Sequence, residues 1–159
     1  MKQLVLDVAP AFLPSLDNFV AGPNSEVLAA LRGVLSGARR ERLLYLFGPV
    51  GSGKSHLLKA AVAVTPGAQL FEGKAGNALP RETGALKLIA IDDVDTLAAA
   101  AQEDLFHLFN AVRVSEALLL VSAVTAPGQL RLRSDAATRL ASMLAYALQP
   151  LSDAEKAQA

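Results

Sequence analysis

Apolar runs alternate with amphipathic segments along this chain. Near-continuous apolar runs are typical of buried parallel strands, whereas apolar residues at intervals of three and four are typical of helices packed on a sheet. We therefore predict an α/β fold, with a parallel sheet and helices on both faces. The predicted strands cover residues 43–47, 69–71, 86–91, 118–122 and 146–148, and the predicted helices residues 25–37, 102–116, 135–144 and a segment from residue 55.

For two of the predicted helices the sequence also predicts the ends or the buried face. Asn24 or Ser25 is expected to cap the first, and Gly37 to end it. The helix over residues 102–116 has the clearest apolar stripe, which is expected to face the sheet. Its members are Leu105, Phe106, Leu108, Phe109 and Val112.

The first strand runs into a glycine-rich segment that fits the pattern G-x-x-x-x-G-K-[ST]. It reads Gly48-Pro49-Val50-Gly51-Ser52-Gly53-Lys54-Ser55. In such a phosphate-binding loop the backbone N–H groups surround the phosphates, because glycine permits the necessary dihedrals. Lys54 would reach the β- and γ-phosphates, and Ser55 would place its hydroxyl on Mg²⁺. A chance glycine turn is the alternative, which the strand before the loop and the helix after it disfavour.

A second acidic signature follows the apolar run over residues 86–91. Asp92, at the end of that strand, is placed to hold Mg²⁺ through water, and Asp93 to orient or deprotonate an attacking water. On its own the pair could equally be turn-forming residues that close a strand. We interpret Asp95 as a solvated residue after the strand.

Composition narrows the class of protein. The chain has 159 residues, 52% of them hydrophobic, with 15 basic and 15 acidic side chains and no cysteine. That suits one domain without disulfides, and zero net charge predicts no strong direct binding to DNA and none to membranes. No signal-peptide core or membrane-spanning run is found, so a cytoplasmic protein is expected.

Three segments make the chain resemble the AAA+ module of bacterial DnaA and its homologues. They are residues 16–22 (Leu-Asp-Asn-Phe-Val-Ala-Gly), residues 53–58 (Gly-Lys-Ser-His-Leu-Leu) and residues 91–93 (Ile-Asp-Asp). Residues 137–140 and 149–153 resemble the Hda branch of this family, whose members inactivate DnaA. The resemblance implies a P-loop AAA+ domain over residues 15–151, and residues 152–159 as the start of a lid helix that the chain cuts short.

This resemblance assigns further roles. Phe19 and Val20 would line an adenine pocket, although ordinary core positions are the alternative, and His56 would belong to the same nucleotide site. Arg139 would be an arginine finger that reaches a γ-phosphate across a subunit boundary, with a surface helix arginine as the alternative. Arg131 and Arg133 are interpreted as solvated. ADP or ATP with Mg²⁺ is the expected cofactor, DnaA the expected partner, and a homo-oligomer is possible within this family.

Residues 1–14 read as an extended arm that contains proline. Within it Gln3, Leu4, Leu6 and Val8 resemble the short peptides that bind the sliding clamp, the β subunit of DNA polymerase III. An edge strand or a disordered start is the alternative.

The chain also departs from the family pattern. Val124 stands where the family carries an aspartate after the sensor 1 strand, so a polar partner for the attacking water is missing unless Ser122 takes over. The connection over residues 72–84 is too short for the insertion with which DnaA contacts single-stranded DNA, and the sensor 2 arginine is absent. We expect weak or no hydrolysis by the chain alone, and an Hda-like regulator. The alternatives are an autonomous DNA-stimulated ATPase of the helicase-loader type and a nucleotide-insensitive clamp adaptor.

Overall fold

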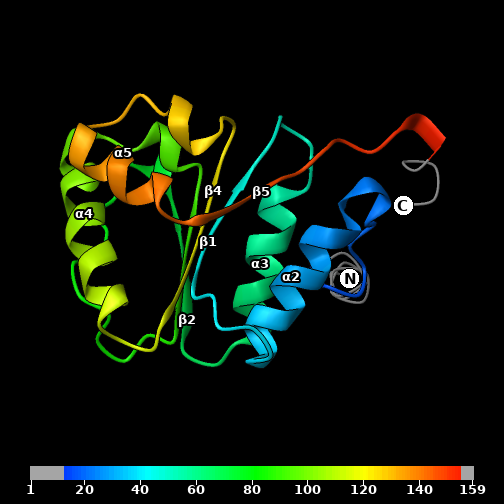
Figure 1. Ribbon diagram of the computed structural model, residues 1–159, viewed down its shortest axis with the longest axis horizontal. Coiled ribbons are helices and arrows are strands. Elements are labelled where there is room, and N and C mark those ends of the chain that lie inside the picture. The colour runs from blue at the N-terminus through cyan, green and yellow to red at the C-terminus, as the bar shows by residue number, and fades with distance from the viewer. Residues whose placement is uncertain (1–12, 155–159) are drawn as a thin grey trace, which may run out of the picture.

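A five-stranded sheet forms the centre of the molecule in the computed structural model, which describes residues 13–154 (Figure 1). The strand order is β2-β3-β4-β1-β5, and every pair is parallel. The strands are β1 (Leu43–Phe47), β2 (Ala68–Glu72), β3 (Leu88–Asp92), β4 (Leu118–Ala123) and β5 (Leu144–Ala147). The predicted fold class is confirmed.

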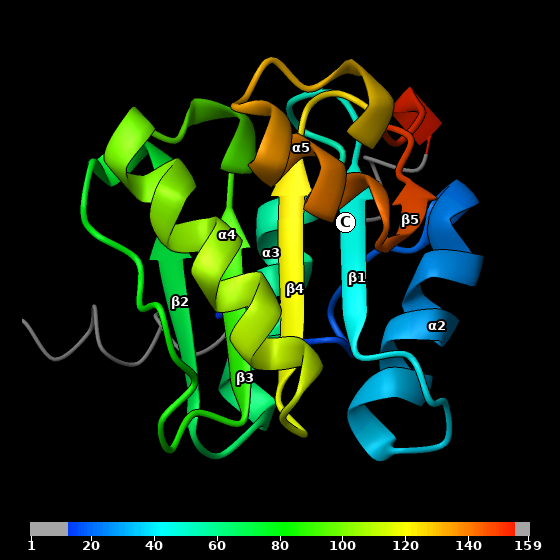
Figure 2. The ribbon, with the colours of Figure 1, turned by 60° about the vertical axis from the view of Figure 1, so that its left-hand side comes forward.

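Helices cover both faces of this sheet (Figures 1 and 2). Helices α2 (Ser25–Ser36) and α3 (Lys54–Val64) lie on one face, and α4 (Ala99–Arg113) and α5 (Ser134–Ala141) on the other. Successive residues of a strand point to opposite faces, so Leu44 and Leu46 pack under α2 and α3 while Tyr45 packs under α4. None of the helices in the described part of the chain is long and apolar enough to cross a membrane.

Several element boundaries differ from the predicted ones. β3 begins two residues later and β5 two residues earlier than predicted, and α5 ends three residues earlier. α4 is displaced by three residues toward the N-terminus. At its carboxyl end the Arg42 guanidinium donates hydrogen bonds to the carbonyl oxygens of Val112 (3.0 Å), Arg113 (3.3 Å) and Ala117 (2.9 Å). A cation on those carbonyl oxygens stabilises this end of the helix. The sequence of α4 alone does not indicate this contact, because Arg42 lies far away in the chain.

Asn24 occupies the N-cap position of α2, as predicted, but the expected side-chain hydrogen bond of a cap is missing. Asn24 makes no capping hydrogen bond to the helix. Its amide instead donates to the Gln149 carbonyl (2.8 Å) and its side-chain oxygen accepts the Gln149 N–H (2.8 Å). Asn24 is only 2% exposed, so this pair ties the start of α2 to the chain that follows β5.

We expect Asn24→Ala to destabilise the fold by about 1–3 kcal/mol, because it removes both hydrogen bonds between the buried Asn24 side chain and the backbone of Gln149. Urea unfolding measures the change. Ser25→Ala is the matched control: Ser25 is the neighbouring, exposed candidate for the cap, and its loss should change stability by less than about 0.5 kcal/mol. Equal losses in the two variants would contradict the role of the Asn24–Gln149 pair.

Candidate functional site

The glycine-rich loop joins the carboxyl end of β1 to the N-terminus of α3. Gly51 and Gly53 have φ of 85° and 101°, a region that other residues seldom adopt. Space is also short: a Cβ on Gly53 would lie 2.7 Å from Cε1 of Phe19, and one on Gly48 would lie 2.4 Å from the Leu148 carbonyl oxygen. The chain therefore requires glycine here for packing as well as for the turn.

Lys54 lies folded back on this loop. Its ammonium donates to the carbonyl oxygens of Gly48 (2.6 Å) and Pro49 (2.9 Å), and the residue is only 7% exposed. Burial lowers the pKa of Lys54, although Asp93 and Asp92 oppose that shift. A buried ammonium held by carbonyl oxygens can turn to stronger anionic acceptors when they are offered.

Asp92 connects the loop to the centre of the sheet. Ser55 Oγ, from the first turn of α3, donates to Asp92 Oδ2 (2.5 Å), and Ser122 Oγ, from β4, donates to Asp92 Oδ1. Ser122 is completely buried and also accepts the Asp93 N–H (2.9 Å). Its hydroxyl is thus occupied in fixing both aspartates.

The donors at this point suit a magnesium ion. A carboxylate and a hydroxyl are hard oxygen ligands, and Mg²⁺ usually keeps several waters and takes few protein ligands. Within residues 13–154 no group of three or more His, Cys, Asp or Glu side chains could hold a metal ion by itself. An ion at Ser55 and Asp92 would therefore need phosphate or water oxygens to complete its coordination.

Asp93 occupies a strained position beside Asp92. It has φ 57° and ψ 55°, and it is the non-glycine residue with positive φ among those described. Lys74, from η3 (Gly73–Ala75), forms an ion pair with it at 3.6 Å. Burial, followed by the charge of Asp92, raises the pKa of the Asp93 carboxyl, and Lys74 opposes the shift.

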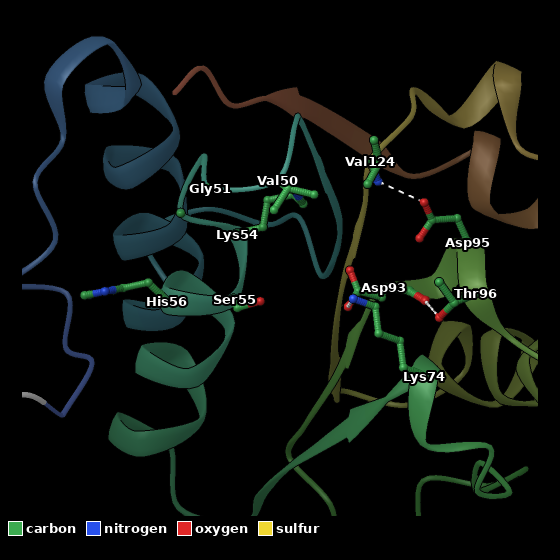
Figure 3. Close-up of a pocket in the computed structure, with 11 residues that line it drawn as sticks. Val50, Gly51, Lys54, Ser55, His56, Lys74, Asp93, Asp95, Thr96 and Val124 are labelled. Atoms are coloured by element: carbon green, nitrogen blue, oxygen red, sulfur yellow. Dashed lines mark hydrogen bonds and ion pairs between the residues drawn. The ribbon is translucent and has the colours of Figure 1, made fainter. Parts of the chain in front are cut away.

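A cavity of about 380 Å³ separates the loop from the end of β3 (Figure 3). Lys54 and Ser55 line one wall, and Lys74 and Asp93 are among the residues of the other. Sequence reasoning missed Lys74, although it follows β2 directly, and ligands bind beyond the carboxyl ends of parallel strands.

The interpretation of Asp95 as a solvated residue is wrong. Asp95 lines the same cavity, where its Oδ2 accepts the Val124 N–H at 3.1 Å (Figure 3). Its other carboxylate oxygen is buried and has no hydrogen-bond partner among the described residues. Val124 also lines this cavity and is 42% exposed.

A second cavity, of about 290 Å³, lies on the other side of the loop. Phe19, Val20 and His56 line it, and Gly51, Gly53 and His56 border both cavities. The Phe19 and His56 rings meet edge to face with centroids 5.4 Å apart, and His56 Nε2 donates to the Ser15 carbonyl oxygen at 2.8 Å. An aromatic wall next to the loop is suited to a flat, apolar group.

Arg139 is not among the residues that line either cavity. It stands in the last turn of α5, with its guanidinium over the ring of Phe106. The structure thus brings the loop, Asp92, Asp93 and the predicted adenine residues together and keeps Arg139 apart. The predicted clamp-binding residues, Gln3, Leu4, Leu6 and Val8, lie outside the described residues.

The sheet, the glycine loop and the acidic pair define a P-loop fold of the AAA+ type, and solved structures agree. Domain III of the replication initiation protein DnaA from Thermotoga maritima is 25% identical over 91% of this chain and 70% of that one, with a TM-score of 0.74. The replication initiator DnaA bound to AMPPCP and single-stranded DNA is 20% identical over 86% of this chain and 51% of that one, with a TM-score of 0.73. This chain spans about half the length of the initiators that it matches.

A relative of higher identity is the protein NMB1076 from Neisseria meningitidis. It is 33% identical over 72% of this chain and 81% of its own, with a TM-score of 0.56. At that identity and coverage the two chains belong to one protein family. No protein-family model matches the chain.

We expect Asp93→Asn to raise the melting temperature at pH 7. A carboxyl with a raised pKa is ionised at a cost to the folded state, and that cost grows as the pH rises from the ordinary value of 3.8 through the raised one. The gain should therefore shrink as the pH is lowered toward 4, whereas the tolerance of asparagine for positive φ does not depend on pH. Thermal melts across this range measure both effects.

The control for this variant is Asp17→Asn, whose side chain is 92% exposed and whose ion pair with Arg32 should contribute little. A lower melting temperature for Asp93→Asn at pH 7 would show that the Lys74 ion pair outweighs the burial of Asp93.

Proposed function

We propose that this chain is an AAA+ nucleotide-binding regulator of replication initiation, of the Hda type. The observation that carries the proposal is the bridge from Ser55 through Asp92 to Ser122, because it fixes the metal-binding oxygens between the glycine loop and the acidic strand end. Cavities on both sides of the loop then offer room for the two ends of a nucleotide.

The bound nucleotide is ADP or ATP with Mg²⁺. The residues of the loop, from Gly48 to Ser55, surround the phosphates, and Lys54 exchanges the two carbonyl oxygens that it now contacts for phosphate oxygens. The base enters the second cavity, against Phe19, Val20 and His56. Ser55 and Asp92 would hold Mg²⁺, which would supply positive charge beside the phosphates.

Nucleotide binding is tested by thermal stability with ADP and Mg²⁺. At a ligand concentration a hundred times the Kd, the wild-type chain should gain roughly 2.7 kcal/mol of stability. Lys54→Ala should lose this gain, because the lost ammonium is the direct phosphate contact. Lys59→Ala is the matched control, since Lys59 lies on the exposed side of the same helix and should keep the full gain.

A wild-type chain whose stability ADP leaves unchanged would contradict nucleotide binding and favour the nucleotide-insensitive clamp adaptor. Rapid hydrolysis by the chain alone, stimulated by DNA and lost in Lys54→Ala, would favour the autonomous ATPase instead.

Two features support slow hydrolysis at this site and action on a partner's nucleotide. Val124 presents an apolar side chain to the phosphate-side cavity, and the Ser122 hydroxyl is already bonded to Asp92. Arg139 lines neither of the two cavities beside the glycine loop, as expected of an arginine that serves a second subunit. We propose that it contacts the γ-phosphate of ATP bound to DnaA, while the arm with Gln3, Leu4, Leu6 and Val8 holds the chain on the DNA-loaded clamp.

The regulatory role is tested by measuring hydrolysis of DnaA-bound ATP with clamp-loaded DNA, ADP and this chain. Arg139→Ala should reduce the stimulation by a factor of roughly 10³ or more at any concentration of the chain. The double variant Gln3→Ala/Leu4→Ala should also lose stimulation, but a high concentration of the chain should restore it, because a tether acts only through effective concentration.

Arg131→Ala, an exposed arginine in the loop before α5, is the control and should stimulate as the wild type does. Full stimulation by Arg139→Ala would overturn the finger role. Full stimulation by the double variant at low concentration would overturn the arm.

A further inference from the structure

Arg139 makes contacts through its backbone and through its guanidinium. Ser142 fixes the backbone, because its N–H (3.1 Å) and its hydroxyl (2.6 Å) both donate to the Arg139 carbonyl oxygen. At the other end, the guanidinium carbon lies 5.1 Å from the centre of the Phe106 ring, on α4. Nε of Arg139 is buried without a hydrogen-bond partner, so the terminal amino groups are the donors that remain to be used.

The neighbouring arginines on this side of the sheet are held differently. Arg81 contacts Asp104 at 2.7 Å and Glu103 at 3.2 Å, and Arg133 contacts Glu103 at 3.4 Å and Asp135 at 3.1 Å. Among residues 13–154 no ion pair includes Arg139. The acidic side chains of α4 are thus paired with other arginines, and an aromatic face takes the place of a carboxylate beside Arg139.

Packing in the core does not explain the position of the Phe106 side chain. Its sequence position predicts it on the buried stripe of α4, and this prediction is wrong. The other four members of that stripe lie in the core under α4, whereas Phe106 is only half-buried and belongs to neither apolar cluster. Its ring instead contacts the Arg139 guanidinium and, edge to face, the ring of the exposed His107 at 5.5 Å.

We propose that Phe106 is a positioning residue that orients Arg139 toward a phosphate group on a second protein; this inference rests on the proposed function. A carboxylate would neutralise the guanidinium and compete with the phosphate, whereas an aromatic face attracts the cation and leaves its charge uncompensated. The guanidinium carbon lies over the ring, and no carboxylate among residues 13–154 pairs with the guanidinium. Its terminal N–H groups, which have no acceptor among those residues, are therefore available for bidentate contact with phosphate oxygens.

The experiment is stimulation of ATP hydrolysis on DnaA by the full chain, with ADP and clamp-loaded DNA, as the concentration of the chain is varied. Phe106→Leu should lower the maximal rate by roughly 2- to 30-fold, the range that cation–π contacts span, with little change in the half-saturating concentration. Phe106→Tyr should restore the rate, because tyrosine keeps the aromatic face. Phe71→Leu, at another partly buried phenylalanine in β2, controls for the loss of apolar contact.

A double-mutant cycle separates positioning from general packing. In the Arg139→Ala background, Phe106→Leu should have no further effect, because the group that it orients is absent. The proposal would be overturned if Phe106→Leu lowered the rate by the same factor with and without Arg139. A wild-type rate for Phe106→Leu alone would also overturn it. Wild-type stimulation by Arg139→Ala would overturn the finger role itself, which is a different failure.

A second measurement does not depend on the partner. The ring current of Phe106 should shift the NMR signals of the Arg139 side chain in the isolated protein. Phe106→Leu should move these signals toward ordinary arginine values, and Phe106→Tyr should leave them in place. Signals that stay unchanged in Phe106→Leu would show that the stacking does not persist in solution, which would overturn the proposal.

Discussion

The placement of one buried carboxylate sets the geometry of the candidate site. Asp92 is 6% exposed, and such a group is costly to bury unless hydrogen bonds compensate it. Ser55 and Ser122 supply them from opposite sides, so α3 and β4 are both tied to the end of β3. Because Ser122 also accepts the Asp93 N–H, the same bridge fixes the left-handed turn that brings Asp93 to the cavity.

The charged groups with a proposed function lie in two separate places. Lys54 lies on one wall of the phosphate-side cavity, and Lys74, Asp93 and Asp95 lie on the other, so opposite charges balance there and an incoming phosphate must displace existing contacts. Arg139, in contrast, stands outside that cavity, and among the described residues it forms no ion pair and its Nε–H donates no hydrogen bond. The first arrangement is suited to holding a ligand, and the second to offering a cation to another molecule.

Features that depend on residues close together in the sequence were predicted correctly. The apolar runs placed all five strands, and the glycine spacing placed the loop at the start of α3, because both signals are local. The errors have distant causes. Asn24 bonds a residue 125 positions away, Arg42 acts on the end of α4, and Phe106 is turned toward α5. Asp95 is held at the cavity by a hydrogen bond from the Val124 N–H, just after β4, and the sequence around Asp95 does not indicate that contact.

The same contacts bear on the proposal that this site hydrolyses a bound nucleotide slowly. An attacking water needs a polar group that is free to bond it, yet the hydroxyls at the site are engaged: Ser55 and Ser122 donate to Asp92, and Thr96 donates to the Asp93 carbonyl oxygen. Val124 adds no polar atom from its side chain. Two carboxylates remain to orient the water: Asp93, which lies beside Lys74, and Asp95, whose second oxygen has no hydrogen-bond partner among the described residues. Under the proposed function, hydrolysis would then depend on groups from a second subunit, and Arg139 is the residue that we propose for this role.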